Sequence, residues 1–252
     1  MRLMIFILLA SCGLHAQNGE YIAKVFESES GSLNYNIMYP HDFDEHEKYP
    51  LMLFLHGAGE RGSDNKAQLI HGSKLFRDSL AKYPAIVIFP QCTKDDYWVD
   101  LKSEGKGQGR SMEVMTGEPN PNMERVISLV DRMLEEKYVD PSRFYVAGLS
   151  MGGMGTMELA WRMPEKITAA IAICGVGPRE KAATMKPVPF WFFHGVDDIV
   201  VPSRYSVQML RAMQVSGGKA KITLYENTGH NSWDQAFVDP DFLPFLFSKS
   251  KS

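Results

Sequence analysis

Hydrophobic positions along the chain form short runs that alternate with amphipathic segments. Near the start, residues 21–26 and 33–39 alternate apolar and polar side chains, and the turn-rich stretch Ser28–Gly31 separates them. A period of two that is interrupted by turn residues predicts two antiparallel strands. The fold is therefore expected to begin with a β-hairpin.

Six later apolar runs lack this alternation and predict strands of a different kind. Strands that are buried on both faces of a parallel sheet read as nearly continuous hydrophobic runs. The six runs are Leu51–Leu55, Ala85–Phe89, Phe144–Ala147, Thr168–Ile173, Phe190–Phe193 and Lys221–Tyr225.

Segments with helical spacing lie between these runs, for example at residues 123–134, 154–161 and 205–213. Strands that alternate with helices indicate right-handed crossovers and a largely parallel sheet with helices on both faces. An antiparallel start followed by such units predicts an α/β class chain with the α/β-hydrolase fold, whose central sheet has about eight strands.

Residues 93–121 follow neither pattern. Their middle part, Lys102–Arg110, is rich in glycine and charged side chains and has no apolar period. A loop of this length inside a compact domain is usually a lid or a binding loop, with surface disorder as the alternative. Trp98 lies near its start and is placed to overhang a site.

The stretch Gly148–Gly152 reads Gly-Leu-Ser-Met-Gly between a predicted strand and a predicted helix. A strained strand-to-helix turn lifts a serine out of the sheet and accepts only small residues on either side of it. The context predicts that Ser150 is a catalytic nucleophile. A plain strand-turn-helix connection is the alternative.

A serine hydroxyl needs a base to accept its proton, and that base needs a carboxylate to hold it. The loop after the fifth apolar run supplies Asp197 and Asp198, and the loop after the sixth supplies His230. The spacing from Asp198 to a following Val-Pro pair favours it over Asp197. The chain order Ser150, Asp198, His230 is the one expected of this fold. His194 is the alternative base, although it more simply packs against the acidic loop.

Attack by a serine on an acyl carbon creates an oxyanion, which two backbone N–H groups usually stabilise. One donor should be Met151, the residue after the nucleophile, and the other should come from the loop His56–Gly59 after the third strand. We expect Ala58 to be this second donor, with Gly59 as the alternative. A tight turn without function would explain the same glycines.

Length, charge and histidine spacing narrow the range of functions. A chain of 252 residues suits one α/β domain, and its net charge of −3 leaves no basic footprint for nucleic acid or an anionic membrane surface. The seven histidines include no paired metal-ligand spacing, and no phosphate-binding loop is present. We therefore expect a small or neutral molecule as the partner, with no metal and no cofactor.

The first sixteen residues read as a secretory signal peptide, because Arg2 precedes the apolar stretch Leu3–Ala10 and small residues end at Ala16. The catalytic domain would then be 17–252, in a secreted or periplasmic protein. A lipobox that ends at Cys12 is the competing interpretation and would anchor the protein to a membrane by a lipid.

Cys92 and Cys174 would then lie in an oxidising compartment, where a disulfide is the default expectation for a pair. They follow strands that we place three positions apart, roughly 14 Å at the usual strand spacing. A disulfide needs Cα atoms within about 7 Å of each other. We therefore predict two buried thiols.

Four motifs together resemble a known family. They are Leu55–Asn65, Pro90–Cys92, Asp140–Gly153 and Gly229–Trp233. In these motifs the chain is similar to secreted bacterial α/β-hydrolases of the predicted peptidase and carboxylesterase group, which are related to polyhydroxybutyrate depolymerases and feruloyl esterases. The similarity runs from about Tyr35 to Phe237.

The resemblance implies a serine carboxylesterase that forms an acyl-enzyme and acts on carbohydrate-linked feruloyl or acetyl esters. It implies the triad and the oxyanion hole named above, and it places Trp98 and Trp233 beside the substrate pocket, unless they belong to the core. The alternatives are a peptidase of the prolyl-oligopeptidase type and a non-catalytic carbohydrate-binding protein on the same fold.

Overall fold

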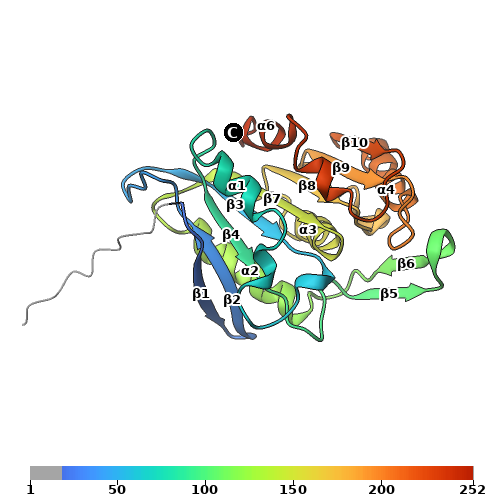
Figure 1. Ribbon diagram of the computed structural model, residues 1–252, viewed down its shortest axis with the longest axis horizontal. Coiled ribbons are helices and arrows are strands. Elements are labelled where there is room, and N and C mark those ends of the chain that lie inside the picture. The colour runs from blue at the N-terminus through green and yellow to red at the C-terminus, as the bar shows by residue number, and fades with distance from the viewer. Residues whose placement is uncertain (1–18, 252) are drawn as a thin grey trace, which may run out of the picture.

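The computed structural model describes residues 19–251, which form an eight-stranded sheet with helices on both faces (Figure 1). The strands follow the order β1-β2-β4-β3-β7-β8-β9-β10. They are β1 (Ile22–Ser28), β2 (Gly31–Met38), β3 (Tyr49–Leu55), β4 (Ile86–Pro90), β7 (Val139–Leu149), β8 (Ala169–Ile173), β9 (Phe190–Gly195) and β10 (Ala220–Tyr225). The predicted signal peptide and the lipobox cysteine lie outside the described residues.

Only the first two pairings in the sheet, β1 with β2 and β2 with β4, are antiparallel. All later pairs are parallel, so the C-terminal ends of β3, β7, β8, β9 and β10 meet at one edge. The predicted α/β-hydrolase fold is confirmed. All eight strands lie where the hydrophobic runs predict them.

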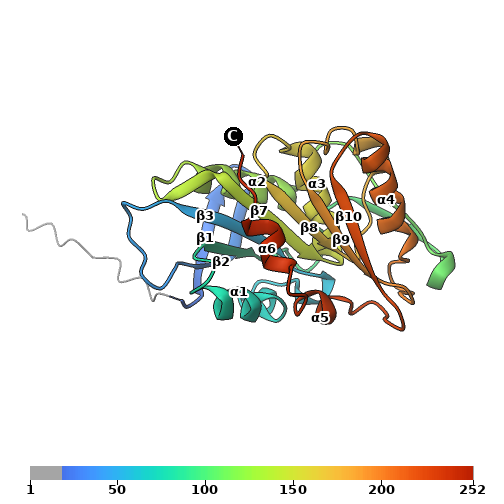
Figure 2. The same ribbon diagram turned by 90° about the horizontal axis from the view of Figure 1, so that it is seen from above.

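The helices divide into two layers, which Figure 2 shows on opposite faces of the sheet. One core lies between the sheet and α2, α3 and α4, and the other between the sheet and α1, α5 and α6. The bounds are α1 (Ser73–Ser79), α2 (Pro121–Leu134), α3 (Met151–Arg162), α4 (Arg204–Val215), α5 (Trp233–Ala236) and α6 (Phe242–Phe247), with 3-10 turns η1 (Ala58–Glu60), η2 (Ala67–Leu69), η3 (Gly107–Gly109) and η4 (Arg179–Lys181).

Helix α2 shows how local sequence fixes an element. The side chain of Asn120 accepts a hydrogen bond from the N–H of Met123 at 3.0 Å, and Pro121 occupies the first turn, where its missing N–H costs nothing. Buried Met123, Val126 and Val130 then face the sheet at helical spacing. This is the helix that the apolar period predicts.

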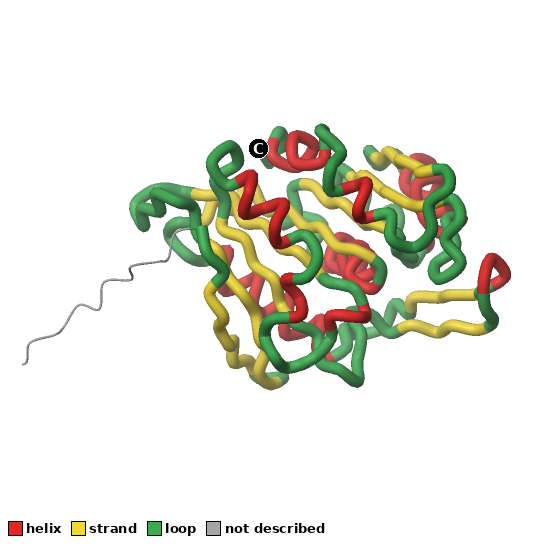
Figure 3. Tube along the Cα trace, in the orientation of Figure 1, coloured by secondary structure: helices red, strands yellow, loops and turns green. Residues whose placement is uncertain are grey.

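The long segment 93–121 contains a hairpin that the sequence pattern did not reveal. Strands β5 (Leu101–Glu104) and β6 (Ser111–Val114) pair antiparallel through η3 and form a separate two-stranded sheet. We call residues 101–114 the hairpin. It extends past the main sheet beside α4 (Figures 1 and 3).

Both cysteines of the described chain are free and buried, as predicted. Cys92 follows β4 and Cys174 follows β8, and these strands are three positions apart in the sheet. The distance between the strands therefore excludes a bridge between them. Among the described residues, no helix is long and apolar enough to cross a membrane.

Candidate active site

Ser150 occupies the sharp turn between β7 and α3, with the positive φ of 53° that marks a strained non-glycine residue. A Cβ on Gly148 would lie 2.3 Å from the carbonyl oxygen of Gly152, and a Cβ on Gly152 would lie 1.9 Å from that of Leu55. Both positions therefore require glycine, because the turn presses against the end of β3. The N–H of Ser150 donates to the carbonyl of Ile173 at 2.8 Å.

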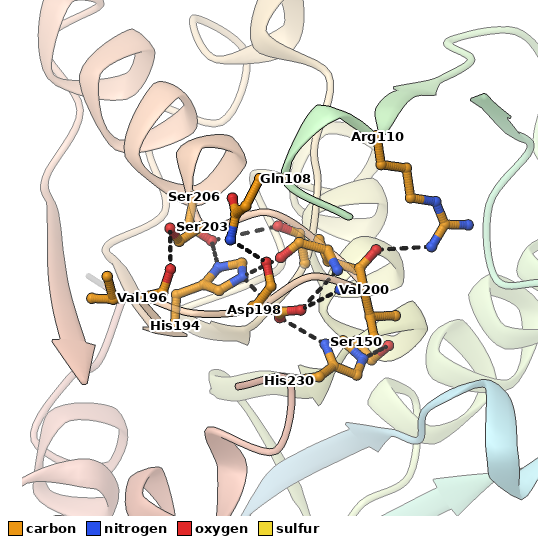
Figure 4. Close-up of polar contacts among 12 residues, drawn as sticks. Gln108, Arg110, Ser150, His194, Val196, Asp198, Val200, Ser203, Ser206 and His230 are labelled. Carbon is orange, nitrogen blue, oxygen red and sulfur yellow. Dashed lines mark hydrogen bonds and ion pairs between the residues drawn. The ribbon is translucent and has the colours of Figure 1, made fainter. Parts of the chain in front are cut away.

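Three predicted side chains come together at this edge of the sheet (Figure 4). Nε2 of His230 lies 2.9 Å from Oγ of Ser150, and Nδ1 of His230 lies 2.7 Å from Oδ2 of Asp198. Because Asp198 can only accept, Nδ1 carries the proton and Nε2 is left to accept one from the serine hydroxyl. The arrangement is that of a serine, histidine and aspartate triad.

The carboxylate of Asp198 is completely buried and held on both oxygens. Oδ1 accepts the N–H groups of Val200 at 2.8 Å and Val201 at 2.9 Å, while Oδ2 faces both His230 and His194. Burial raises the pKa of Asp198, but hydrogen bonds from the two histidines and from Val201 outweigh it and hold the pKa below its usual range. Asp198 is therefore ionised when the site acts.

His194 lies behind the acid and does not contact the serine in the described chain. Its buried Nε2 lies 2.8 Å from the carbonyl oxygen of Val201 and 3.2 Å from Oδ2 of Asp198, so this nitrogen carries a proton. Its Nδ1 lies 2.7 Å from Oγ of Ser206. Within residues 19–251 no hydrogen bond joins His194 to Ser150, and Asp197, the alternative acid, is exposed.

The two predicted oxyanion donors each begin a helical turn. Ala58 is the first residue of η1 and Met151 is the first residue of α3. The first N–H groups of a helix have no acceptor within that helix, so both groups are available to a ligand. The roles of Ala58 and Met151 stay predictions, and Gly59 remains the alternative donor.

His56 fixes the loop that carries Ala58. Its ring is completely buried, with Nδ1 2.6 Å from the carbonyl oxygen of Gly57, and its Nε2 accepts the N–H of Cys92 at 3.0 Å. Burial lowers the pKa of His56 to about 4, so the ring is neutral near pH 7. The neutral tautomer with the proton on Nδ1 satisfies both contacts.

Trp98 lies beneath the same loop, which corrects one prediction. Its indole is fully buried, and Nε1 donates to the carbonyl of His56 at 3.0 Å. A completely buried side chain cannot line a substrate pocket, so Trp98 belongs to the core, the alternative that the sequence left open. Together, Trp98 and His56 hold the loop His56–Gly59, which carries the predicted donor Ala58, in place.

Trp233 takes the place predicted for a residue at the edge of the site. It is half-buried, and its ring meets that of His230 edge to face at 5.4 Å between centroids. On its other side it contacts His71 at 5.3 Å. Its role in binding substrate stays a prediction, but its position beside the base suits one.

The hairpin supplies site residues that the sequence analysis missed. Nε2 of Gln108 donates to the carbonyl oxygen of Asp198 at 2.9 Å, and Nη1 of Arg110 donates to that of Val200 at 2.8 Å (Figure 4). These carbonyls belong to the loop whose N–H groups hold the carboxylate. The hairpin therefore braces the acid loop from outside.

Helix α4 clamps the hairpin in return. The guanidinium of Arg204 donates to the carbonyls of Gln108 and Arg110, and the hydroxyl of Tyr205 donates to the latter at 2.9 Å and accepts the N–H of Met112 at 2.7 Å. No sequence signal points to these contacts, because about ninety residues separate the partners and the acceptors are main-chain carbonyls.

One group of possible metal ligands lies in the described chain at the triad itself. Sγ of Cys174 and the nearest donor atoms of Asp198 and His230 all lie within 4.8 Å of one another. The last two already share a hydrogen bond, and burial raises the pKa of the Cys174 thiol, which must ionise to bind a metal. These residues fit a triad better than a metal site.

The assembled geometry suits acyl transfer. A hydroxyl nucleophile is hydrogen-bonded to a base and that base to an ionised acid, and the first N–H groups of two helical turns have no acceptor within those turns.

The chain is similar to known hydrolases in sequence and in fold. The sequence model of the phospholipase/carboxylesterase family matches residues 43–241. A bifunctional acetylxylan esterase/xylanase from Neocallimastix patriciarum is 38% identical over 78 residues, and dipeptidyl-peptidase 5 from Porphyromonas gingivalis is 28% identical over 149 residues. The crystal structure of a thermostable esterase superposes with a TM-score of 0.82 at 31% identity, covering 92% of this chain and 63% of that one.

The two curated relatives are much longer than the part of them that the chain matches. The alignment spans 30% of this chain and 11% of the acetylxylan esterase/xylanase, and 59% of this chain and 20% of the dipeptidyl-peptidase. Both similarities therefore concern only a small part of each relative. The match of the family covers most of the present chain, including every residue of the triad.

Proposed function

The chain belongs to the phospholipase/carboxylesterase family, and we propose that it is a serine carboxylesterase that works through an acyl-enzyme. The observation that carries the proposal is the continuous hydrogen-bonded series from Ser150 through His230 to Asp198. A buried, ionised aspartate behind a neutral histidine is what a serine needs to become a nucleophile near pH 7.

In the proposed reaction, Oγ of Ser150 bonds to the acyl carbon while its proton passes to Nε2 of His230. The carbonyl oxygen becomes an oxyanion, which accepts the N–H groups of Ala58 and Met151. The tetrahedral intermediate expels the alcohol, which takes the proton back from His230. Water activated by the same nitrogen then releases the acid and restores the serine.

We propose carbohydrate-linked acetyl or feruloyl esters as the substrates. One relative carries the name of an acetylxylan esterase joined to a xylanase, and the half-buried indole of Trp233 beside His230 offers a face for a sugar or a phenolic ring. The predicted signal peptide supports a secreted or periplasmic location, free or anchored at Cys12, where such polymers are met.

Two other functions stay in competition. Likeness to a dipeptidyl-peptidase favours amide cleavage, whereas a non-catalytic carbohydrate-binding protein would have no need of the intact triad. An ester carbonyl is more electrophilic than an amide carbonyl, and an alkoxide is a better leaving group than an amide nitrogen, which must be protonated before it leaves. The same triad therefore cleaves esters more readily than amides.

The test is kcat/KM of residues 17–252 on methyl ferulate, p-nitrophenyl acetate and a dipeptide p-nitroanilide, with Ser150→Ala as the blank. We expect ester turnover that exceeds anilide turnover and disappears in the variant. A preference for ferulate would indicate an aromatic acyl pocket, and turnover of acetate alone a small one. Turnover of the anilide alone, or of none of the three, would contradict the proposal.

A further inference from the structure

A recess of about 470 Å³ lies between the hairpin, the loop after β8 and the first turns of α4. We refer to it as the hairpin recess. The residues that matter for its chemistry are Glu113, Val176, Arg179, Glu180, Tyr205 and Gln208. Its volume falls within the range typical of small-ligand sites.

Two of the segments that line the hairpin recess are close in the chain to residues that contact the triad. Val176 follows Ile173 by three residues, or roughly 10 Å of chain, and the carbonyl of Ile173 accepts the N–H of Ser150 at 2.8 Å. The hairpin wall begins at Gly109, next to the Gln108 that donates to the carbonyl of Asp198. The two segments that line the recess therefore follow directly on residues that contact Ser150 and Asp198.

The polar side chains around the recess are not used by the fold. In the described part of the chain, Glu113, Arg179, Glu180 and Gln208 make no side-chain hydrogen bond and no ion pair. By contrast, the neighbouring Arg204 is fully engaged with carbonyls of the hairpin. These four residues line the recess and are exposed or half-buried, so their polar groups are open to a ligand.

The charges and hydrogen-bonding groups that line the recess indicate which class of ligand it suits. Two carboxylates, Glu113 and Glu180, and two guanidinium groups, Arg179 and Arg204, line the recess, so their charges cancel and do not favour an anion or a cation. Carboxylates accept hydrogen bonds and Arg179 and Gln208 donate them. A neutral ligand with many hydroxyl groups, each both donor and acceptor, matches this set, and Tyr205 adds an aromatic surface.

We infer that the hairpin recess binds the sugar on the alcohol side of the ester, so that the hairpin is both a brace for Asp198 and a subsite for a neutral oligosaccharide. This inference rests on the proposed esterase function for its catalytic meaning. Sugar binding itself does not depend on catalysis, so an experiment can test the sugar site separately from the esterase function.

The first measurement compares Glu113→Ala and Arg179→Ala with wild type on an acetylated xylo-oligosaccharide and on p-nitrophenyl acetate, which has no sugar. Glu104→Ala is the matched control, because Glu104 is also an exposed acid on the hairpin but does not line the recess. We expect kcat/KM on the sugar ester to fall about five-fold or more through KM in the two recess variants only. Activity on p-nitrophenyl acetate should stay within about two-fold.

The second measurement is the affinity of Ser150→Ala protein for the unacetylated xylo-oligosaccharide, with and without Glu113→Ala. Weaker sugar binding in the double variant supports a sugar site in the recess, whether or not wild type turns over the esters. Failure of wild type to turn over either ester would contradict the proposed function but not the sugar site. Equal losses on both esters, no change on either, or binding that ignores Glu113 would each overturn the inference.

Discussion

The buried His56 beneath the oxyanion loop allows a quantitative test of how that loop is held. Replacing it by Gln keeps an acceptor for the N–H of Cys92 and a donor for the carbonyl of Gly57, which His56 contacts at 3.0 and 2.6 Å. Glutamine cannot take up a proton. The variant therefore removes the titratable ring at position 56 and keeps one donor and one acceptor there for the same two hydrogen bonds.

The magnitude follows from the pKa of His56, which burial lowers from 6.5 to about 4. Above pH 6.5 both the folded and the unfolded chain hold a neutral ring, and the full stability is present. Between pH 6.5 and 4 the unfolded chain binds a proton that the folded chain does not, so stability falls by about 3 kcal/mol. At pH 5.5 the loss should be about 1.4 kcal/mol.

Urea unfolding of wild type and His56→Gln at pH 7, 5.5 and 4 measures this loss. Other titrating groups affect both proteins alike, so the stability advantage of wild type over the variant should shrink by about 3 kcal/mol from pH 7 to pH 4. If the two proteins lose stability in parallel, His56 is not held neutral in the folded state. The proposed support of the oxyanion loop would then be wrong.

Three further predictions concern the turn, the brace and the acid. Gly152→Ala should prevent folding or lower the free energy of unfolding by several kcal/mol, because the added Cβ would meet the carbonyl of Leu55. Gly59→Ala should leave the thermal midpoint nearly unchanged, because no atom lies within 4 Å of the added Cβ. Equal midpoints in the two variants would refute the packing argument. Gln108→Ala should lower kcat about two- to ten-fold without changing KM, and an altered KM alone would speak against a brace. Asp198→Asn should lower kcat about 10⁴-fold through the wrong histidine tautomer, and a loss under ten-fold would exclude it as the acid.

The central fold could be predicted because its signals are local. The parallel strands other than the edge strand β10 are buried on both faces along most of their length and therefore read as continuous apolar runs, and the runs at 51–55, 144–147 and 190–193 all became strands. The triad could be predicted from the sequence for a related reason. In a parallel sheet, residues that follow successive strands meet at one edge, so Ser150, Asp198 and His230 could be placed together by chain order.

The remainder of the site depends on contacts between distant segments. The hairpin has strands of four residues, too short for a pattern to stand out, and its anchors are long polar side chains that reach carbonyls about ninety residues away. The sequence left Trp98 open between pocket and core, because the carbonyl of His56 that accepts its indole N–H lies 42 residues away in the chain. Helix α6 is apolar almost throughout and shows no helical period.

The measurement that tests the account most directly is covalent labelling with a fluorophosphonate probe, followed by intact mass and peptide mapping. We predict one adduct per chain on Ser150, formed at a rate that Asp198→Asn reduces, and no adduct in Ser150→Ala, which also loses ester turnover. A labelled residue other than Ser150, or a Ser150→Ala protein that retains wild-type turnover, would contradict the assignment of the nucleophile and with it the proposed enzyme.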